Sequence, residues 1–210
     1  VNEALLQNSS IKFVGSATIG TDHLDIAALE QHGIQWSNAA GCNAQAVAEY
    51  VITALLHVRP ELVDANATFS LGIVGLGNVG TRLAYMAKLL GWRVIGYDPL
   101  VQRTQVDQVE FNELLQQADA ISIHVPLTQT GLYPTYHLFN TATLAQMQPD
   151  AILINSARGP VIEEAALIQD LKATQRTVIL DVFEHEPVIS AELLDLLTLV
   201  TPHIAGYSLE

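Results

Sequence analysis

A glycine-rich turn is the stretch of this sequence whose spacing most clearly indicates chemistry. Residues 75–80, GLGNVG, fit the pattern G-x-G-x-x-G. The first glycine of that pattern permits a tight turn, the second lets a pyrophosphate approach the backbone, and the third lets a helix pack against a strand. The helix that follows offers free N–H groups and its positive dipole end to phosphate. The predicted dinucleotide contacts are Gly75, Gly77, Asn78, Val79 and Gly80.

An aspartate at the end of the next predicted strand favours NAD over NADP. Asp98 lies 18 positions beyond Gly80, close to the place expected for a carboxylate that binds the adenosine ribose. The 2′-phosphate of NADP would meet a like charge there, and no arginine follows directly, since Arg103 comes some way on. The alternative is that Asp98 caps a turn before Pro99.

Arg158 is a candidate for binding a carboxylate. It follows a predicted buried strand and precedes Gly159, in a chain with only nine Lys and Arg residues. A guanidinium in that place would hold a carboxylate through two hydrogen bonds and polarise a neighbouring carbonyl. The alternative is a surface arginine paired with Glu163 or Glu164.

A histidine beside a carboxylate would supply acid–base chemistry. His203 lies in the stretch TPHIAG, and Glu186 lies in DVFEHEP. A carboxylate fixes the orientation of a histidine and raises its basicity, so the pair would exchange a proton with an oxygen while a hydride moves at the adjacent carbon. Glu184 and His185 compete as local candidates, and spacing does not choose among them.

The remaining histidines and the acidic groups give no metal-binding pattern. His32 and His57 are interpreted as surface or packing residues, and no H-x-E-x-H-like spacing occurs. His124 ends a predicted strand, so a place in the lining of a site is one interpretation, whereas the role of His23 is undecided. The sequence therefore predicts no metal site.

The elements that would position these residues form an α/β pattern. Apolar runs at 71–74, 93–97, 120–125, 151–155, 177–181 and 199–200 alternate with helical patterns. This predicts a doubly wound parallel sheet of Rossmann type, covered by helices on both faces. In such a sheet, ligands lie beyond the carboxyl ends of the strands. The polar and neighbouring residues at those ends are Asp98, His124, Val125, Ser156, Ala157, Arg158, Asp181 and His203.

Composition restricts the class of protein. The chain has 210 residues, half of them hydrophobic, with a net charge of −13 and no basic run, which argues against nucleic acid or an anionic membrane as partner. Cys42 is the single cysteine, which excludes a disulfide framework within the chain and fits a reducing cytoplasm. No apolar run reaches membrane-spanning length.

The order of the elements indicates two domains. Residues 1–44 contain a βαβ-like piece that is too small to fold alone, and a long apolar helix at 44–58 leads to the nucleotide unit. We predict a partial substrate domain at 1–44, an NAD-binding domain at 45–206, and at 207–210 the start of a return to the substrate domain.

The combination of these motifs resembles the D-isomer-specific 2-hydroxyacid dehydrogenases. The matching pieces are 75–80 with Asp98, NSARG at 155–159, DVFEHEP at 181–187 and TPHIAG from Thr201, in the right order over nearly the whole chain. The resemblance implies NAD as cofactor, and Arg158, Glu186 and His203 as catalytic residues. It implies further NAD contacts at Val125, Ser156, Ala157, Asp181 and Gly206. A threonine usually stands where this sequence has Val125.

Further stretches resemble one branch of that family. These are FVGSAT at 13–18, GTDH at 20–23, GCNA at 41–44, AEY at 48–50 and HIAGYSLE at 203–210. They imply a small phosphorylated hydroxy acid as substrate, with contacts at Thr18 and Tyr207. The substrate domain would be flavodoxin-like. Members of the branch begin earlier and continue into a C-terminal dimerisation domain, so we expect a piece of a longer, homodimeric protein.

Two other functions stay open. One is a dehydrogenase of another 2-hydroxy acid, of glycerate or phosphoglycerate type. The other is an NAD-sensing binding protein without catalysis, against which the presence of Arg158, Glu186 and His203 counts.

Overall fold

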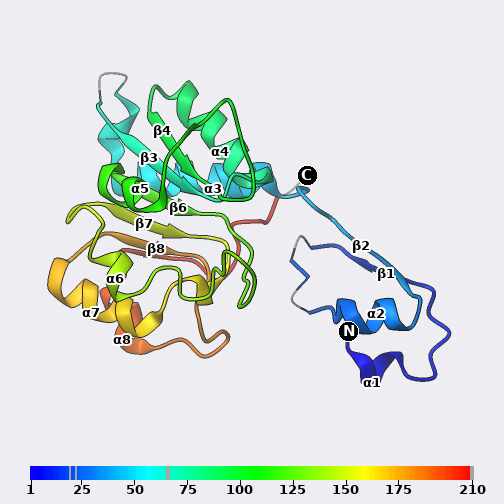
Figure 1. The fold of residues 1–210 in the computed structure, drawn as a ribbon. Coiled ribbons are helices and arrows are strands. Elements are labelled where there is room, and N and C mark those ends of the chain that lie inside the picture. Colours follow the sequence, from blue (N-terminus) through cyan, green and yellow to red (C-terminus); the bar gives the residue numbers. More distant parts are fainter. Residues whose placement is uncertain (19, 22, 65–66, 209–210) are drawn as a thin grey trace. The chain divides into compact units, whose positions relative to one another are not determined.

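The computed structural model describes residues 1–18, 20–21, 23–64 and 67–208 (Figure 1). The chain divides into two compact units, Val1–Asn43 and Ala44–Glu210. The predicted return segment 207–210 ends in two residues that lie outside the described part. No helix in the described ranges is both long and apolar enough to cross a membrane.

The first unit is a small βαβ piece preceded by a short helix. Its elements are α1 (Glu3–Leu6), β1 (Phe13–Ser16), α2 (Ile26–Gln31) and β2 (Gln35–Asn38). The two strands are parallel, with Phe13 opposite Gln35. The Asp25 carboxylate accepts the Ala28 amide at 3.0 Å and so caps α2. Among the described residues of this unit, the buried core consists of Leu6, Leu24, Ala28, Leu29 and Ile34.

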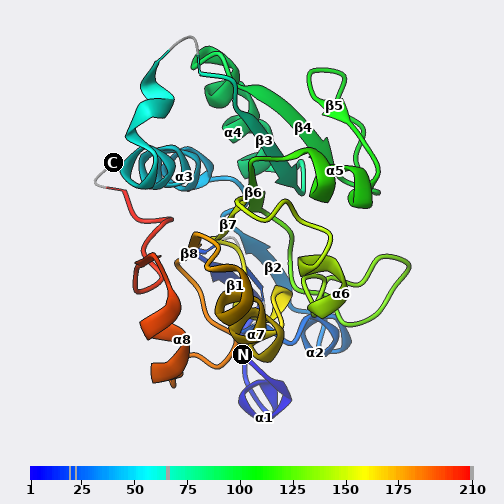
Figure 2. The same ribbon diagram turned by 90° about the vertical axis from the view of Figure 1, so that its left-hand side faces the viewer.

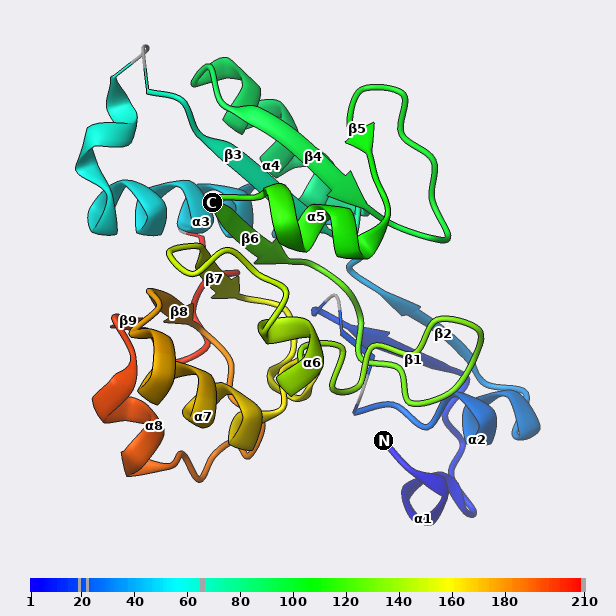
Figure 3. The ribbon, with the colours of Figure 1, turned by 60° about the vertical axis from the view of Figure 1, so that its left-hand side comes forward.

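The second unit contains a seven-stranded parallel sheet. Its strands are β3 (Ser70–Val74), β4 (Arg93–Tyr97), β5 (Asp107–Gln108), β6 (Ala120–Ile123), β7 (Ile152–Asn155), β8 (Val178–Leu180) and β9 (Leu199–Val200). They follow the order β5-β4-β3-β6-β7-β8-β9, and Figure 3 shows β4, β3, β6, β7 and β8 side by side. The six predicted strands are confirmed. β5 was not predicted, because two residues carry no pattern.

Helices cover both faces of this sheet. They are α3 (Ala44–Val58), η1 (Pro60–Val63), α4 (Asn78–Leu89), α5 (Phe111–Gln117), α6 (Thr141–Leu144), η2 (Gly159–Val161), α7 (Glu164–Thr174) and α8 (Ala191–Leu196). Side chains of α3 and α4 share one core with the sheet, and side chains of α5, α6, α7 and α8 share the other. The doubly wound α/β fold class is therefore confirmed.

The strands show why buried parallel sheets appear as continuous apolar runs. In β7, Ile152 and Ile154 belong to the core beneath α3 and α4, whereas Leu153 between them belongs to the opposite core. All four residues of β7 are buried. Successive side chains point to opposite faces, and because both faces are covered, the first three residues of β7 are all apolar.

Candidate active site

The three glycines of the turn between β3 and α4 have different surroundings. Gly75 has a φ of +95°, and a Cβ atom there would lie 2.5 Å from the His124 carbonyl oxygen. A Cβ atom on Gly80 would lie 2.0 Å from the Gly75 carbonyl oxygen, whereas one on Gly77 would meet nothing within 4 Å. Packing within the chain therefore requires Gly75 and Gly80. The surroundings of Gly77 are open, as a site of ligand approach must be.

The N-terminus of α4 leaves its first amides without a side-chain cap. Gly77 is the N-cap residue and makes no side-chain hydrogen bond to the helix. Asn78, the first helical residue, is exposed. Free N–H groups at the positive end of a 12-residue helix form a favourable place for phosphate.

Asp98 accepts three backbone hydrogen bonds. Its Oδ2 accepts the Leu76 amide of the glycine turn at 2.8 Å, and its Oδ1 accepts the amides of Leu100 (2.9 Å) and Val101 (3.1 Å). The turn-capping role considered from the sequence is thus present in the structure. The same bonds hold the carboxylate, which is half-buried, against the glycine turn, and contact with the ribose stays a prediction.

Arg103 lies beside the glycine turn. The sequence does not indicate this position, because Arg103 does not directly follow Asp98. Its Nε donates to the Leu76 carbonyl oxygen at 3.1 Å. The loop folds back because Gln108 accepts the Arg103 amide at 2.6 Å and donates to the Val101 carbonyl oxygen at 2.9 Å. A positive charge therefore stands near the adenosine end predicted for the cofactor.

The loop after β7 is shaped by Asn155. This side chain is buried; its Oδ1 accepts the Ala157 amide at 3.0 Å, and its Nδ2 donates to the Arg158 carbonyl oxygen at 2.9 Å. The sequence predicts Asn155 only as a strand residue. A polar side chain at the end of a buried strand nevertheless indicates that it binds the backbone of the loop that follows. The Arg158 side chain is half-buried, and its Nη1 donates to the Ala157 carbonyl oxygen at 2.7 Å.

Ser156 in this loop carries an unsatisfied polar atom. Its Oγ is buried and has no hydrogen-bond partner in the described part of the chain. An unpaired buried hydroxyl is unfavourable, so a ligand that reaches it would gain a hydrogen bond. Together with the open approach at Gly77, this orphaned atom fits a cofactor bound along the rim.

Glu186 and His203 form a pair. Oε2 of Glu186 lies 3.1 Å from Nδ1 of His203, and its Oε1 accepts the Phe183 amide at 2.8 Å. The side chains are 36% and 54% exposed, so the pair faces solvent at the end of the sheet. Because Nδ1 is engaged, Nε2 is the nitrogen of His203 that is left to exchange a proton.

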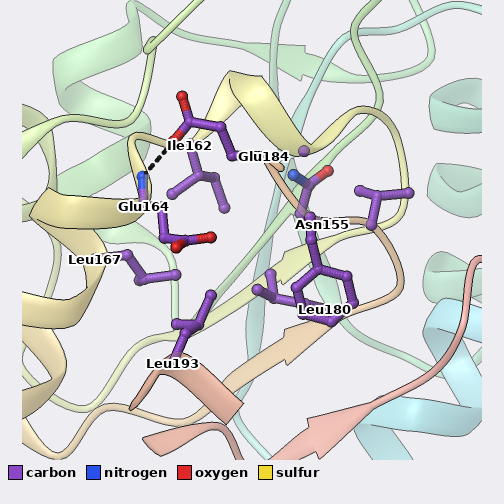
Figure 4. Close-up of a pocket in the computed structure, with 10 residues that line it drawn as sticks. Asn155, Ile162, Glu164, Leu167, Leu180, Glu184 and Leu193 are labelled. Atoms are coloured by element: carbon purple, nitrogen blue, oxygen red, sulfur yellow. Dashed lines mark hydrogen bonds between the residues drawn. The ribbon is translucent and has the colours of Figure 1, made fainter. Parts of the chain in front are cut away.

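Glu184 points elsewhere. Its Oε1 lies 2.5 Å from Nε2 of His137, and its Oε2 accepts the Glu164 amide at the start of α7 at 2.8 Å. Figure 4 shows this second bond at the edge of a pocket lined also by Asn155, Leu167 and Leu180. Spacing in the sequence did not choose between Glu184 and Glu186 as the partner of His203. The structure pairs His203 with Glu186. His185 is exposed.

Asp181 holds the loop that carries His203. It is buried, and its Oδ1 and Oδ2 accept the amides of Ile204 and Ala205, both at 2.8 Å. Its carbonyl oxygen accepts the His203 amide at 2.8 Å. Gly206 and Tyr207 follow directly, and Tyr207 is 80% exposed.

His124 and Val125 come just after β6, which ends at Ile123. The Val125 side chain lies against Gly75, on which an added Cβ would come within 2.9 Å of Val125 Cγ1. Nε2 of His124 lies 2.8 Å from Oγ of Ser122, and desolvation lowers the pKa of His124 to about 3. The imidazole is therefore neutral at physiological pH and carries no charge to the rim.

Thr18 belongs to the first unit. Its Oγ1 lies 2.9 Å from Oγ of Ser16 and donates to the Gly20 carbonyl oxygen at 3.1 Å. Nε2 of His23 lies 3.1 Å from the same Ser16 Oγ. The hydroxyls of Ser16 and Thr18 and the imidazole of His23 thus lie close together at the end of β1.

The arginine that is most buried in the described ranges belongs to the framework. Arg176 is 4% exposed, and its Nε donates to Oδ2 of Asp170 at 2.8 Å. Its Nη1 donates to the Gln148 carbonyl oxygen at 2.6 Å. Burial of an arginine is therefore not enough to mark a ligand site in this chain. Among the described residues, no group of three or more His, Cys, Asp and Glu side chains could hold a metal ion.

The parallel sheet, the glycine turn and the polar rim define a dinucleotide-binding domain of the dehydrogenase type. Residues 60–205 match the model of the D-isomer specific 2-hydroxyacid dehydrogenase, NAD binding domain. The chain belongs to this family, and NAD is its cofactor.

Named relatives are similar along the whole chain. It is 69% identical over 210 residues to an erythronate-4-phosphate dehydrogenase of Acinetobacter baumannii (strain AYE), and 65% identical to one of Acinetobacter baylyi. It covers 59% of the length of each.

Solved structures show the same fold. A D-mandelate dehydrogenase of Rhodotorula graminis matches with a TM-score of 0.86 at 28% identity, over 98% of this chain and 69% of that one. A D-lactate dehydrogenase of Aquifex aeolicus, complexed with NAD and lactic acid, matches with a TM-score of 0.83 at 26% identity, over 99% and 74%.

Proposed function

We propose that the full-length protein oxidises the 2-hydroxyl of 4-phospho-D-erythronate to the 2-oxo acid, with NAD, in the biosynthesis of pyridoxal 5′-phosphate. The observation that carries the proposal is the Glu186–His203 pair, in a chain 69% identical to relatives named for this activity. An acid–base histidine at the rim is what an alcohol dehydrogenation requires.

Each residue has one task in the proposed mechanism. NAD, when bound, supplies the acceptor for the hydride that leaves C2. Nε2 of His203 takes the proton of the 2-hydroxyl, so that loss of hydride and proton converts the alcohol into a ketone. Glu186 holds Nδ1 of His203 and stabilises the imidazolium. Arg158 binds the substrate carboxylate.

The cofactor and substrate contacts are proposed on the same basis. Gly75, Gly77, Asn78, Val79 and Gly80 would cradle the pyrophosphate, and Asp98 the adenosine ribose. Val125, Ser156, Ala157, Asp181 and Gly206 would line the rest of the cofactor, with the orphaned Ser156 hydroxyl as a donor or acceptor for it. Val125 has no hydroxyl, so its contact would come from the backbone. Thr18 and Tyr207 would bind the substrate.

We also propose that the full-length protein works as a homodimer in the cytoplasm. The cytoplasmic assignment is supported by Cys42, the single cysteine of these 210 residues, which is free and exposed. The homodimer rests on the family resemblance.

The test is an assay of NADH formation by the full-length protein with 4-phospho-D-erythronate, beside glycerate, 3-phosphoglycerate and lactate. We expect the highest kcat/KM for 4-phospho-D-erythronate. A higher kcat/KM for another acid would identify that acid as the substrate and the protein as a different 2-hydroxyacid dehydrogenase. Tight NAD binding without turnover of any acid would instead identify an NAD-sensing protein.

A further inference from the structure

A chain of hydrogen bonds connects α3 to the loop that carries His203. The hydroxyl of Tyr50 lies 2.6 Å from Oγ1 of Thr201, and Thr201 Oγ1 donates to Oδ1 of Asp181 at 2.6 Å. Tyr50 lies in the second turn of α3, 151 positions before Thr201. Figure 2 shows the C-terminal segment, drawn in red, running up to α3.

The direction of each bond in the chain is fixed. Backbone amides donate to both oxygens of Asp181, so these oxygens act as acceptors. The Thr201 hydroxyl therefore donates its hydrogen bond to Asp181, and its oxygen accepts a hydrogen bond from the Tyr50 hydroxyl. Desolvation by burial raises the pKa of Tyr50, which keeps the phenol protonated and able to donate.

His203 needs this support because its backbone conformation is unfavourable. Its φ is +56°, in the left-handed region that residues other than glycine seldom adopt. Asp181 binds the amides of His203, Ile204 and Ala205, and so holds the backbone on both sides of the strained residue. Thr201 and Tyr50 in turn hold the Asp181 carboxylate.

We propose that Tyr50 is a positioning residue for catalysis: through Thr201 and Asp181 it holds the loop 201–205, so that His203 stays aligned with Glu186. The inference rests on the proposed function of His203. It adds a role for α3, whose first residue, Ala44, directly follows the first unit. Tyr50 is not among the proposed contacts of the acid or NAD and acts on Asp181 only through Thr201, so in this proposal its removal should slow the chemical step more than it weakens either ligand.

The experiment uses the full-length protein with Tyr50→Phe, Thr201→Val and the double variant. Each single change removes one hydroxyl with little change of shape, and we expect kcat to fall about tenfold. The KM for 4-phospho-D-erythronate and the Kd for NAD should change less than about twofold. The double variant should lose no more than a single one, because either change interrupts the same chain. Thr201→Ser, which keeps the hydroxyl, should restore most of kcat.

Two readouts separate positioning from a merely structural role. With substrate deuterated at C2, the isotope effect on kcat should increase in Tyr50→Phe, because hydride transfer becomes slower relative to product release. Amide hydrogen exchange at residues 201–206 should also accelerate. Tyr85→Phe is the matched control; Tyr85 is 61% exposed on α4 and should show none of these effects.

An unchanged kcat and unchanged amide exchange in Tyr50→Phe would overturn the inference, as would losses that multiply in the double variant. A wild-type protein that turns over no hydroxy acid would overturn the proposed function instead. The exchange measurement would still decide whether Tyr50 holds the loop.

Discussion

Two glutamate–histidine pairs of the NAD-binding unit differ in what they do at the scale of single residues. Each glutamate also accepts one backbone amide, that of Phe183 for Glu186 and that of Glu164 for Glu184, but Glu186 and His203 are both substantially exposed, whereas the side chain of Glu184 is only 10% exposed. An exposed pair contributes only about 0–1 kcal/mol to stability. A glutamate that satisfies a helix amide and a histidine in a nearly buried place contributes more. The first pair therefore suits chemistry and the second suits structure.

Single substitutions of Glu186, His203 and Glu184 test this assignment. Glu186→Gln and His203→Ala should each lower kcat by about 10²–10⁴-fold, with a change of less than about 1 kcal/mol in the free energy of unfolding. Glu184→Gln should keep kcat and destabilise by about 1–3 kcal/mol. Steady-state kinetics and urea unfolding on the same preparations measure both. Near-normal turnover by His203→Ala would refute the mechanism.

His124 provides a pH dependence of stability. Its pKa in the folded protein is about 3, far below the ordinary value of 6.5 that it regains on unfolding. Below pH 6.5 the unfolded chain therefore binds a proton that the folded protein refuses, so stability falls as pH falls, by at most about 1.4 kcal/mol per pH unit.

Replacing His124 by glutamine should flatten this dependence. Glutamine can offer an amide group to Ser122 in place of Nε2, and it does not titrate. Urea unfolding between pH 7 and pH 5 should show a shallower loss of stability in His124→Gln than in the wild type. Equal slopes would mean that the native histidine takes up the proton as readily as the unfolded one.

In the turn between β3 and α4, one glycine is required for folding and another is left open for binding. A Cβ atom on Gly80 would collide with backbone, whereas one on Gly77 would meet no atom of the described chain within 4 Å. We expect Gly80→Ala to destabilise by about 3 kcal/mol or more. Gly77→Ala should leave the thermal midpoint nearly unchanged and weaken NAD binding about tenfold or more, because the methyl group would occupy the path of the pyrophosphate.

Thermal unfolding and calorimetric titration with NAD on both variants test this division. If Gly77→Ala binds NAD as tightly as the wild type does, the pyrophosphate does not bind at this turn.

The elements that the sequence predicted are those with enough residues to show a pattern. Both faces of the sheet are covered, so the long strands stand out as apolar runs, and the glycine turn has fixed spacing. The two-residue β5 has neither property. α8 was also missed, although Ser190, whose Oγ accepts the Leu193 amide at 3.3 Å, is a recognisable capping signal.

Contacts between distant segments were harder to predict than strands. Arg103 reaches the glycine turn only because Gln108 folds its loop back, and Tyr50 reaches Thr201 across 151 positions. Local spacing contains no information on such pairs. The grouping of the strand-end residues could be predicted from the sequence, because parallel strands bring their carboxyl ends to one edge of the sheet regardless of the conformation of the loops between them.

The whole molecule is uneven in how its cores are distributed. The unit Ala44–Glu210 contains both large cores of the parallel sheet, while the described residues of Val1–Asn43 form one small core with five buried members. A piece of that size buries too little apolar surface to be stable alone. Every residue proposed to contact NAD lies in the larger unit, whereas Thr18, proposed for the substrate, lies in the smaller one.

The larger unit should therefore fold alone and bind NAD without turning over acid. Binding at 100 times Kd stabilises a protein by about 2.7 kcal/mol, so NAD at that excess should raise the thermal midpoint of residues 44–210 by about 5–10 °C. NADP at the same concentration should give a smaller shift, because its 2′-phosphate meets the Asp98 carboxylate. Asp98→Ser is the matched control and should bring the two shifts closer together, since Arg103 beside the turn then faces the phosphate unopposed. A midpoint that NAD leaves unchanged would show that the first unit is needed to form the cofactor site.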